Sequence, residues 1–543
     1  MSNQSSNHKN NKTWAWIKQH KLLLLVIILF LILNNISYIM GFWQASQEPD
    51  LVYTATPYTN RADHFVYLSH VEQGKEGHLF TKLLYNHLAE NNVLFSPHWY
   101  VIGQFSKITG ISSPASYFIF RIIFLIGFLF VLWWFVKNIF SDYKKSIVAM
   151  LAILFGNGLG TILINIYPQT PLIPTNLWMP ESITFLTVNQ TPLFVLALIL
   201  MLLTFSFFIE GIKRKKISLI WLACGTNLLL TLIHTYDLFI TASVLAGWSA
   251  FKFYQTRNKK IILYLALVGV TSGVGALYYV WLLRQDLAMI QWNLQNICTS
   301  GPFAEYLWGM GLLFVFSVAG IIYIIKNKKF KNDYLNLITV WAILGWGMIY
   351  LPVHFNRRLS HGWHMALVIT SLVFFFWLYK KTPAILKGLL LTVVGFLVIF
   401  DTINFLILDS SIIYHKDDSH YFMQSKEKHL IYEQIKNTTD EYSVIMTRGF
   451  DGNQLPGFTG RKVYTGHIMG TWEAILKDRE VERLWSNPND ISEWLEKNNI
   501  SYIFASRIYI TEFDKIKWLA KESYIEPIVD NEEFILYKVL LEE

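Results

Sequence analysis

The sequence predicts an all-α polytopic membrane protein of about eleven transmembrane helices, followed by a small α/β domain outside the membrane. Three observations lead to this fold class. Of the 543 residues, 53% are hydrophobic and only 15% are charged, and the mean hydropathy is +0.34, which ordinary soluble domains do not reach. Apolar runs long enough to cross a bilayer recur along the chain. After residue 410 the composition changes to that of a soluble domain.

The apolar runs define a multi-pass domain over residues 22–410. A bilayer crossing takes roughly 20 residues, and the runs lie at 22–41, 117–136, 146–166, 191–211, 217–234, 236–253, 261–283, 305–325, 334–353, 363–379 and 384–408. The first run follows a basic cytoplasmic segment, residues 1–21, and its LLLLVIILFLIL core would also suit a signal peptide. No small-x-small cleavage site follows, so we expect an uncleaved membrane anchor.

Lysine and arginine set the orientation, because short cytoplasmic loops carry them and short outer loops do not. They gather in alternate loops, at 137–145, 213–216, 252–260, 326–331 and 380–387. This pattern places the N-terminus inside the cytoplasmic membrane and everything after the last run outside. It also accounts for the net charge of +8 without a nucleic-acid-binding face, so no nucleic acid partner is expected. The two cysteines, Cys224 and Cys298, predict no disulfide framework.

Three arginines stand against this orientation signal. Arg284, Arg357 and Arg358 are the basic residues of the short outer loops. A basic residue at a helix end often contacts lipid headgroups. For Arg284 the sequence favours headgroup contact and a functional role equally. For the adjacent pair Arg357 and Arg358 we favour phosphate binding, because outward arginines oppose the topogenic bias and a guanidinium fork suits a phosphate.

The first outer loop, residues 42–116, is long and polar. Helical spacing of apolar residues predicts two short amphipathic helices on the outer membrane surface, one around residues 65–71 and one around residues 80–88. Asp63 and His64 would lie on the first of these helices.

Other outer loops add ionisable residues on the same side of the membrane. Glu181 lies in WMPESITF, His234 and Asp237 lie in HTYD, and His361 follows the arginine pair. Each has a simpler explanation, since His234 and Asp237 would cap helices and Glu181 would be a solvated loop acid. Their gathering at the outer mouth favours a site there. Inside the spans only Asp401 stands out, which argues against an ion-coupled carrier.

Residues 411–543 predict a small α/β domain outside the membrane. We expect helices in SHYFMQSKEKHLIYEQIKN and near 511–522, strands in YSVIMT and EEFILYKVL, and a helix followed by a strand in ISEWLEKNNISYIFAS. The stretch GFTGRKVYTGH has glycines that suggest turns, and a structural loop is favoured there over a binding loop. Acceptor recognition is a candidate role for this domain.

The whole arrangement resembles the GT-C superfamily of membrane glycosyltransferases, in particular the group of protein O-mannosyltransferases and aminoarabinose transferases. The resemblance rests on the cytoplasmic N-terminus, the long first outer loop with an acidic residue, the many helices and the outer C-terminal domain. The segments NRADHFVY, WMPESITF, HTYD and FNRRLSHG carry it locally. Family members often have two acids in the first outer loop, whereas this chain has Asp63 beside His64, with EPD upstream as the other match.

The resemblance implies a glycosyltransferase that takes a sugar from a polyprenyl-phosphate donor and passes it to an envelope glycan, lipid or protein at the outer face. A lipid or glycan transporter and a non-catalytic envelope scaffold are the alternatives. The reaction needs a base for the acceptor hydroxyl and cations for the departing phosphate. The expected catalytic residues are Asp63, His64, Glu181 and Asp237, and the expected phosphate-binding residues are Arg357, Arg358, His361 and Arg284. No cofactor is assigned, and a divalent cation is a candidate without assigned ligands.

Overall fold

The structure is a computed structural model that describes residues 3–416, 419–486, 491–508 and 513–540. The chain forms two compact units. Unit 1 comprises Met1–Met40, Arg121–Ser272 and Thr299–Tyr414, and unit 2 comprises Gly41–Phe120, Gly273–Cys298 and His415–Glu543. The first outer loop and the C-terminal part, which the sequence analysis treated separately, therefore belong to one unit.

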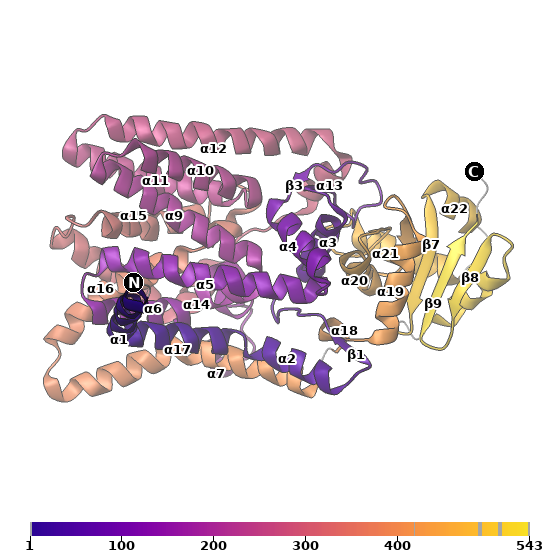
Figure 1. The fold of residues 1–543 in the computed structure, drawn as a ribbon, viewed down its shortest axis with the longest axis horizontal. Coiled ribbons are helices and arrows are strands. Elements are labelled where there is room, and N and C mark those ends of the chain that lie inside the picture. The colour runs from indigo at the N-terminus through magenta and orange to yellow at the C-terminus, as the bar shows by residue number, and fades with distance from the viewer. Residues whose placement is uncertain (1–2, 417–418, 487–490, 509–512, 541–543) are drawn as a thin grey trace. The chain divides into compact units, whose positions relative to one another are not determined.

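Unit 1 is built from helices that run side by side (Figure 1). Its elements, some of which extend into unit 2, are α1 (Asn3–Asn34), α5 (Ser113–Ile139), α6 (Tyr143–Phe155), α7 (Gly160–Ile166), η1 (Thr175–Leu177), η2 (Pro180–Ser182), α8 (Thr184–Gln190), α9 (Pro192–Arg214), α10 (Ile217–Ile233), α11 (Asp237–Thr256), α12 (Lys260–Gln285), α14 (Phe303–Lys326), α15 (Asp333–Met348), η3 (Asn356–Ser360), α16 (Trp363–Lys381) and α17 (Ala384–His415).

Each predicted apolar run coincides largely with one or two helices. Not every helix is long enough to cross a membrane by itself. Among the described residues, 6 helices are long and apolar enough to cross a membrane, or up to 8 if each of two bent pairs counts as one span. The bent pairs are Gln19–Asn34 with Ile36–Gln47, at 53°, and Tyr143–Phe155 with Gly160–Ile166, at 49°. α10 is apolar but shorter. The count of eleven spans therefore stays a prediction.

Asp401 is not the only ionisable side chain that lies well inside a predicted span. Asp401 is buried in α17 and accepts a hydrogen bond from Asn176 Nδ2 at 2.6 Å. Arg121 in α5, inside the second predicted span, is also fully buried, and it donates to the Val188 carbonyl at 3.0 Å and to Asn34 Oδ1 at 3.3 Å. Both groups hold neighbouring segments of unit 1 together, because each exchanges hydrogen bonds with buried polar atoms.

Unit 2 combines short helices with small strands. Its elements are α2 (Ile36–Gln47), which begins in unit 1, β1 (Leu51–Tyr53), α3 (Arg61–Glu76), β2 (Phe80–Thr81), β3 (Leu94–Phe95), α4 (Pro97–Thr109), α13 (Leu287–Gln295), α18 (Ser419–Phe422), β4 (Met423–Ser425), α19 (Lys426–Thr438), β5 (Val444–Met446), α20 (Gly449–Thr459), β6 (Lys462–Val463), α21 (Ala474–Ser486), α22 (Ile491–Lys497), β7 (Ile500–Ser506), η5 (Lys515–Lys521), β8 (Ile525–Asp530) and β9 (Phe534–Val539).

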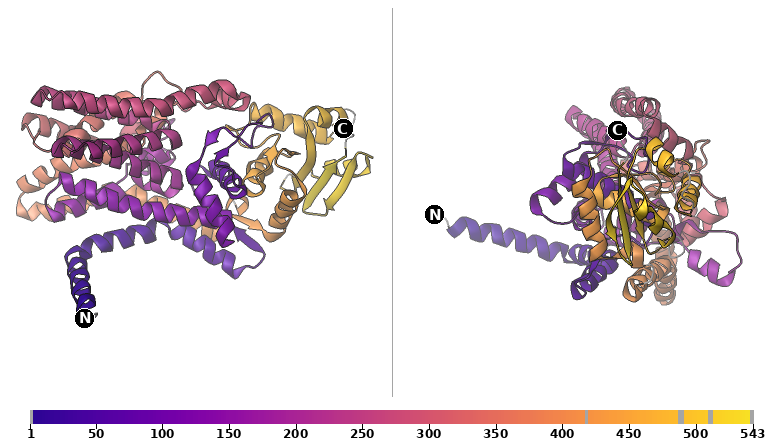
Figure 2. Two further views of the ribbon diagram at one scale, coloured as in Figure 1. Left: turned by 45° about the horizontal axis from the view of Figure 1, so that its top comes forward. Right: turned by 90° about the vertical axis from the view of Figure 1, so that its right-hand side faces the viewer.

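A mixed sheet of order β6-β5-β7-β9-β8 forms the core of unit 2 (Figure 2). Alternate residues along β7 point to opposite faces, as strand geometry requires. Ile503 and Ala505 pack with Trp485 of α21 and Ile516 of η5. Tyr502 and Phe504 pack with α19 and α20. Helices therefore cover both faces of the sheet, which explains why its strands are apolar on both sides.

The first outer loop contains one of the two predicted amphipathic helices. α3 carries Asp63 as predicted, and Gly77 at φ 111 ends it. The second predicted helix, around residues 80–88, is wrong: Phe80–Thr81 form β2, paired with β3, and the next helix is α4. Leu83 packs with Leu282 and Met289, whereas Tyr85 joins the core beside α19. Because these side chains face different neighbours, tertiary packing overrides the helical spacing.

The C-terminal segment follows most of the predicted element pattern. The predicted helix over 419–437 is interrupted by β4, which pairs with β1 through Leu51 and Ser425. Strands β5, β7 and β9 and helix α22 lie where the sequence analysis expected them. The predicted helix near 511–522 falls partly outside the described residues, and its described part is the 3₁₀ helix η5. The predicted placement of this segment outside the membrane stays a prediction.

Candidate functional site

Three short segments of unit 1 carry the residues that the sequence analysis selected there. Glu181 lies in η2, His234 and Asp237 lie in the turn between α10 and α11, and η3 carries the arginine pair and leads to His361. η3 packs against η2, α11 and α15. These selected residues therefore lie on neighbouring helix ends and loops rather than along the helices.

The two arginines lie against aromatic rings. The guanidinium carbon of Arg357 is 4.9 Å from the ring centroid of Trp178, and that of Arg358 is 4.6 Å from the ring of Tyr236. Both side chains are half-buried. Arg357 Nε makes no hydrogen bond with any residue that the structure describes. Stacking orients the guanidinium planes, which suits them to a bidentate anion.

The backbone around the arginine pair is fixed by side chains. Asn356 Oδ1 accepts a hydrogen bond from the Ser300 backbone N–H at 2.7 Å, and Asn356 Nδ2 donates to the Leu351 carbonyl at 2.9 Å. Ser360 Oγ donates to the Arg357 carbonyl at 2.8 Å. These bonds hold η3 at both ends, so the positions of the arginines do not depend on the arginine side chains alone.

Glu181 is buried near one of the arginines. Its exposed fraction is 5%, so the simpler alternative, a solvated loop acid, is wrong. Glu181 Oε2 has no hydrogen-bond partner among the described residues. The hydroxyl of Tyr306, which is 2.8 Å from Ser300 Oγ, interacts electrostatically with both Glu181 and Arg357. An acid, a phenol and a guanidinium therefore share one neighbourhood in unit 1.

His234, Asp237 and His361 converge in a second, buried cluster. His361 Nδ1 lies 2.9 Å from Asp237 Oδ2 and 3.1 Å from Oδ1, and His234 Nδ1 lies 3.0 Å from the same Oδ2. Phe194 packs against both imidazoles, with ring centroids 5.4 Å and 5.5 Å away. The N-terminus of α11 has no side-chain cap among its described neighbours, so the carboxylate of Asp237 serves the histidines instead of capping the helix.

Asp63 in unit 2 is held by two side chains. Asn60 Nδ2 donates to Asp63 Oδ2, and His467 Nε2 is 2.8 Å from Asp63 Oδ1. His467 Nδ1 accepts the backbone N–H groups of Met469 and Gly470, at 3.2 Å and 3.0 Å. Because Nδ1 is an acceptor, the proton of the neutral imidazole lies on Nε2 and points at Asp63. Asp63 is thus oriented but still partly exposed.

The remaining selected residues of unit 2 have different surroundings. His64 is fully buried, with Nε2 2.9 Å from the Thr54 carbonyl and its ring against Tyr117. Burial lowers the pKa of His64 to about 4, so the imidazole is neutral at pH 7. Arg284 is exposed near the end of α12. The catalytic role of His64 and the phosphate-binding role of Arg284 stay predictions.

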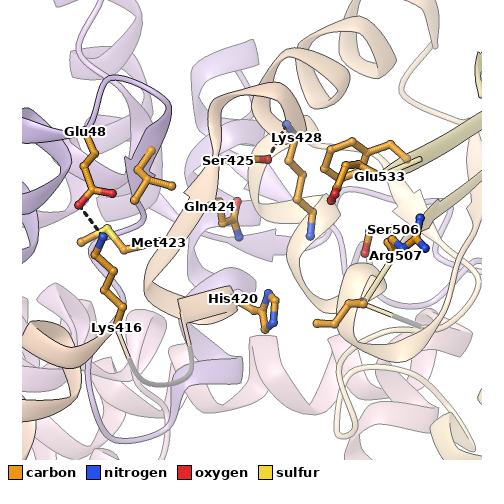
Figure 3. Close-up of a pocket in the computed structure, with 13 residues that line it drawn as sticks. Glu48, Lys416, His420, Met423, Gln424, Ser425, Lys428, Ser506, Arg507 and Glu533 are labelled. Atoms are coloured by element: carbon orange, nitrogen blue, oxygen red, sulfur yellow. Dashed lines mark hydrogen bonds and ion pairs between the residues drawn. The ribbon is translucent and has the colours of Figure 1, made fainter. Parts of the chain in front are cut away.

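Unit 2 also contains a pocket of about 480 Å³ that is lined by both polar and apolar side chains. Glu48 and Lys416 lie at one side of it, Ser506, Arg507 and Glu533 lie at the other, and Gln424 lies between them (Figure 3). Gln424 is buried, and neither its amide oxygen nor its amide nitrogen has a hydrogen-bond partner among the described residues. A buried amide left unpaired costs free energy, which a polar ligand would recover.

Sequence reasoning missed three residues of these sites. His467 closes the stretch GFTGRKVYTGH, which had been singled out but interpreted as a structural loop. Tyr306 lies at the start of an apolar run, where a tyrosine is unremarkable in sequence. Gln424 lies in β4, which was predicted as helix. Only the unusual glycine spacing before His467 could have drawn attention to any of them.

Of the comparisons with known proteins, the one with solved structures finds a similar fold. No protein-family model and no curated protein sequence matches the chain. Among solved structures, the chain is similar to ArnT from Cupriavidus metallidurans bound to undecaprenyl phosphate, with a TM-score of 0.53 and 11% identity over 95% of this chain and 98% of ArnT. The apo state of the same protein gives a TM-score of 0.53 and 10% identity over 97% and 98%. The GT-C resemblance is confirmed for the fold, which together with the apolar helices supports a multi-pass membrane protein.

Proposed function

We propose that the protein is a glycosyltransferase that moves a sugar from a polyprenyl-phosphate donor to an acceptor at the outer face of the cytoplasmic membrane. The fold shared with ArnT supports the class of reaction. The observation that carries the proposal is the arginine pair, whose half-buried guanidinium groups lie over aromatic rings. A polyprenyl-phosphate head group brings an anion to such a surface.

Arg357 and Arg358 would bind the donor phosphate. Each is oriented by an aromatic ring and mounted on a backbone that Asn356 and Ser360 hold in place. A fixed fork can form paired, charge-assisted hydrogen bonds to phosphate oxygens. The same groups would stabilise the charge that develops on the leaving phosphate. Arg284 is a further candidate for this role, from the sequence alone.

Asp63 would act as the general base. In the reaction, the acceptor oxygen forms a bond to the anomeric carbon, the bond from that carbon to the phosphate oxygen breaks, and polyprenyl phosphate leaves with the electron pair. The acceptor proton passes to the Asp63 carboxylate, which His467 and Asn60 orient. Glu48, Asp50 and Glu181 are the alternative bases if Asp63 does not serve.

Other carboxylates would support the transition state. As its bond to the phosphate breaks, the transferred sugar gains oxocarbenium character, which a nearby carboxylate stabilises. Glu181 suits this role better than Asp237, because Glu181 Oε2 has no partner among the described residues, whereas Asp237 is close to two imidazoles. His361 stays a candidate for the donor phosphate site, and His64 stays a candidate catalytic residue, both from the sequence alone.

The pocket around Gln424 would receive the acceptor. Its lining includes amide, hydroxyl and charged groups of both signs, which can form hydrogen bonds with a polyhydroxylated or zwitterionic group. The unpaired amide of Gln424 offers one donor group and one acceptor group to such a ligand.

The test uses purified protein, a labelled polyprenyl-phosphate sugar and candidate envelope acceptors. Transfer predicts release of polyprenyl phosphate that depends on the acceptor. A lipid or glycan transporter, the main alternative, predicts that the donor stays intact, and so does a non-catalytic envelope scaffold. An intact donor with every acceptor class tried, including glycan, lipid and protein, would exclude the proposed reaction.

A further inference from the structure

The charged side chains of the pocket of about 480 Å³ in unit 2 are largely paired. Lys416 forms an ion pair with Glu48 at one side of the pocket (Figure 3). Lys428, which also lines the pocket, has its Nζ 2.8 Å from the fully buried carboxylate of Asp451 and 3.0 Å from Gln454 Oε1. A charged ligand would have to compete with these pairs, and breaking a buried ion pair leaves one charge without a partner.

The remaining charges of the lining favour neither sign. Arg507 and Glu533 have opposite charges, and neither has an ion-pair partner among the residues that the structure describes. Both side chains are exposed, so water and salt screen their charges. The pocket therefore offers a ligand hydrogen bonds rather than a net charge.

Gln424 contributes hydrogen-bonding groups that are shielded from water. Its exposed fraction is 4%, and neither its amide oxygen nor its amide nitrogen has a partner among the described residues. Its backbone is fixed, because β4 pairs with β1 through Gln424 and Val52. An amide presents an acceptor and two donor hydrogens side by side. A ligand that satisfies this amide must therefore present a donor and an acceptor side by side as well.

Two adjacent hydroxyl groups meet this requirement. Each hydroxyl can both donate and accept, and hydroxyls on neighbouring carbons of a sugar ring lie close enough to contact both polar atoms of one amide. A peptide bond does not meet it, because its N–H and C=O point in opposite directions in the trans form. We propose that the pocket binds a neutral saccharide, with two adjacent hydroxyl groups on the Gln424 amide.

Helix α20 connects this pocket to the helix that carries Asp63. Asp451 and Gln454, which hold the lysine of the lining, lie on α20. From the same helix, Asn453 Nδ2 donates to the Ala62 carbonyl at 3.2 Å. A bound saccharide would therefore be held on the same framework as the proposed general base. Its role as the acceptor rests on the proposed transfer reaction, whereas its binding is measured separately.

The test is saturation-transfer NMR on the full-length protein in nanodiscs, because sugar-headed detergents would compete for the pocket. The probes are the neutral methyl glycosides of glucose, galactose, mannose and rhamnose. Glucuronic acid, glucosamine and a capped glycine peptide are the charged and peptide comparisons. We expect saturable binding of at least one neutral glycoside, and loss of that binding when its adjacent hydroxyls are O-methylated. Gln424→Leu should weaken the binding about tenfold or more, since two hydrogen bonds are lost.

Gln434→Leu is the matched control, because Gln434 lies on α19 outside the pocket lining and its variant should bind as wild type does. The melting temperature shows whether each variant is folded, and the O-methylated probes test the same contact on wild-type protein if a variant is not. The source of the saccharide can be distinguished as well. Tighter binding of a long-chain alkyl glycoside than of the methyl glycoside would identify a glycolipid head group, and equal binding would identify a glycan chain.

Three results would overturn the inference. The first is no saturable binding of any neutral glycoside, as expected of a pocket that holds only water. The second is a preference for a charged or peptide probe, and the third is glycoside binding that is unchanged in Gln424→Leu. Saccharide binding without sugar transfer would contradict the proposed function and leave the saccharide site standing, whereas transfer to a peptide without saccharide binding would do the reverse.

Discussion

Replacing Arg357 or Arg358 by lysine separates phosphate binding from lipid anchoring. Lysine keeps the positive charge, so a residue that only reaches for headgroups should be replaceable at little cost. Lysine loses the planar fork and the stacking seen for Arg357 on Trp178, at 4.9 Å. A single ammonium group cannot reproduce the paired hydrogen bonds of a guanidinium to a phosphate.

The expected size follows from these losses. A hydrogen bond to a charged group contributes about 1.5–3 kcal/mol, and lysine can keep one of the two bonds. Adding the weakened ring contact, we expect about 2 kcal/mol per position, which corresponds to roughly thirtyfold weaker donor use. Alanine at both positions removes both charges and should abolish turnover.

The assay is kcat/KM for labelled polyprenyl-phosphate sugar at saturating acceptor, which reports donor binding together with leaving-group stabilisation. Arg257→Lys is the matched control, since Arg257 also stacks on an aromatic ring, Tyr254 at 5.1 Å, but lies in a loop predicted to be cytoplasmic. Wild-type kinetics in the Arg357→Lys, Arg358→Lys double variant would refute the phosphate clamp and leave Arg284 as the remaining candidate.

Four further predictions can be checked independently. Asp63→Asn should lower turnover by about a hundredfold or more, the low end for loss of a general base, with normal expression and membrane insertion; activity close to wild type would transfer the role to another acid. The pKa of His64 is about 4 in the folded chain, whereas an ordinary, solvent-exposed histidine such as that of the unfolded chain has a pKa of 6.5. As the pH falls, the unfolded chain therefore binds the proton first. Stability should therefore decrease below about pH 6.5, by about 2 kcal/mol at pH 5 for this residue, and chemical unfolding of His64→Gln should show a smaller decrease if the reasoning holds. Gln424→Leu should raise the KM for the acceptor without lowering the melting temperature, because it removes an unpaired buried amide; an unchanged acceptor KM would remove the pocket from the proposal. A topology reporter fused after Glu543 should be active only outside the cytoplasm, and activity inside would reverse the orientation.

The helices could be predicted from sequence because their signal is local. Apolar runs of bilayer length, and the basic loops between them, depend only on neighbouring residues. The prediction of a second helix in the first outer loop was wrong because the structure there depends on contacts between residues that are far apart in the sequence. Apolar residues around Leu83 and Tyr85 recur at helical spacing, but Leu83 and Tyr85 pack in different hydrophobic clusters. Only the folded chain determines which neighbours each side chain contacts.

The same difference between local signals and long-range contacts applies to the candidate sites. The selection of Glu181, Asp237 and His361 relied on their common side of the membrane, and the structure gathers them on adjoining loops. The contact of Asp63 with His467 joins residues 404 positions apart, which no spacing rule can find. The burial of Glu181 was likewise invisible, because solvated and buried loop acids look alike in a single sequence.

Accounting for the sugar in proteoliposomes tests the central claim most directly. The protein is reconstituted with a polyprenyl-phosphate sugar labelled in the sugar, and an acceptor is added outside. We predict that label leaves the lipid fraction and appears on the acceptor in equal amount to the polyprenyl phosphate released, and that the Arg357→Ala, Arg358→Ala double variant abolishes both. Label that crosses the bilayer still attached to its lipid, with no polyprenyl phosphate released, would contradict the account.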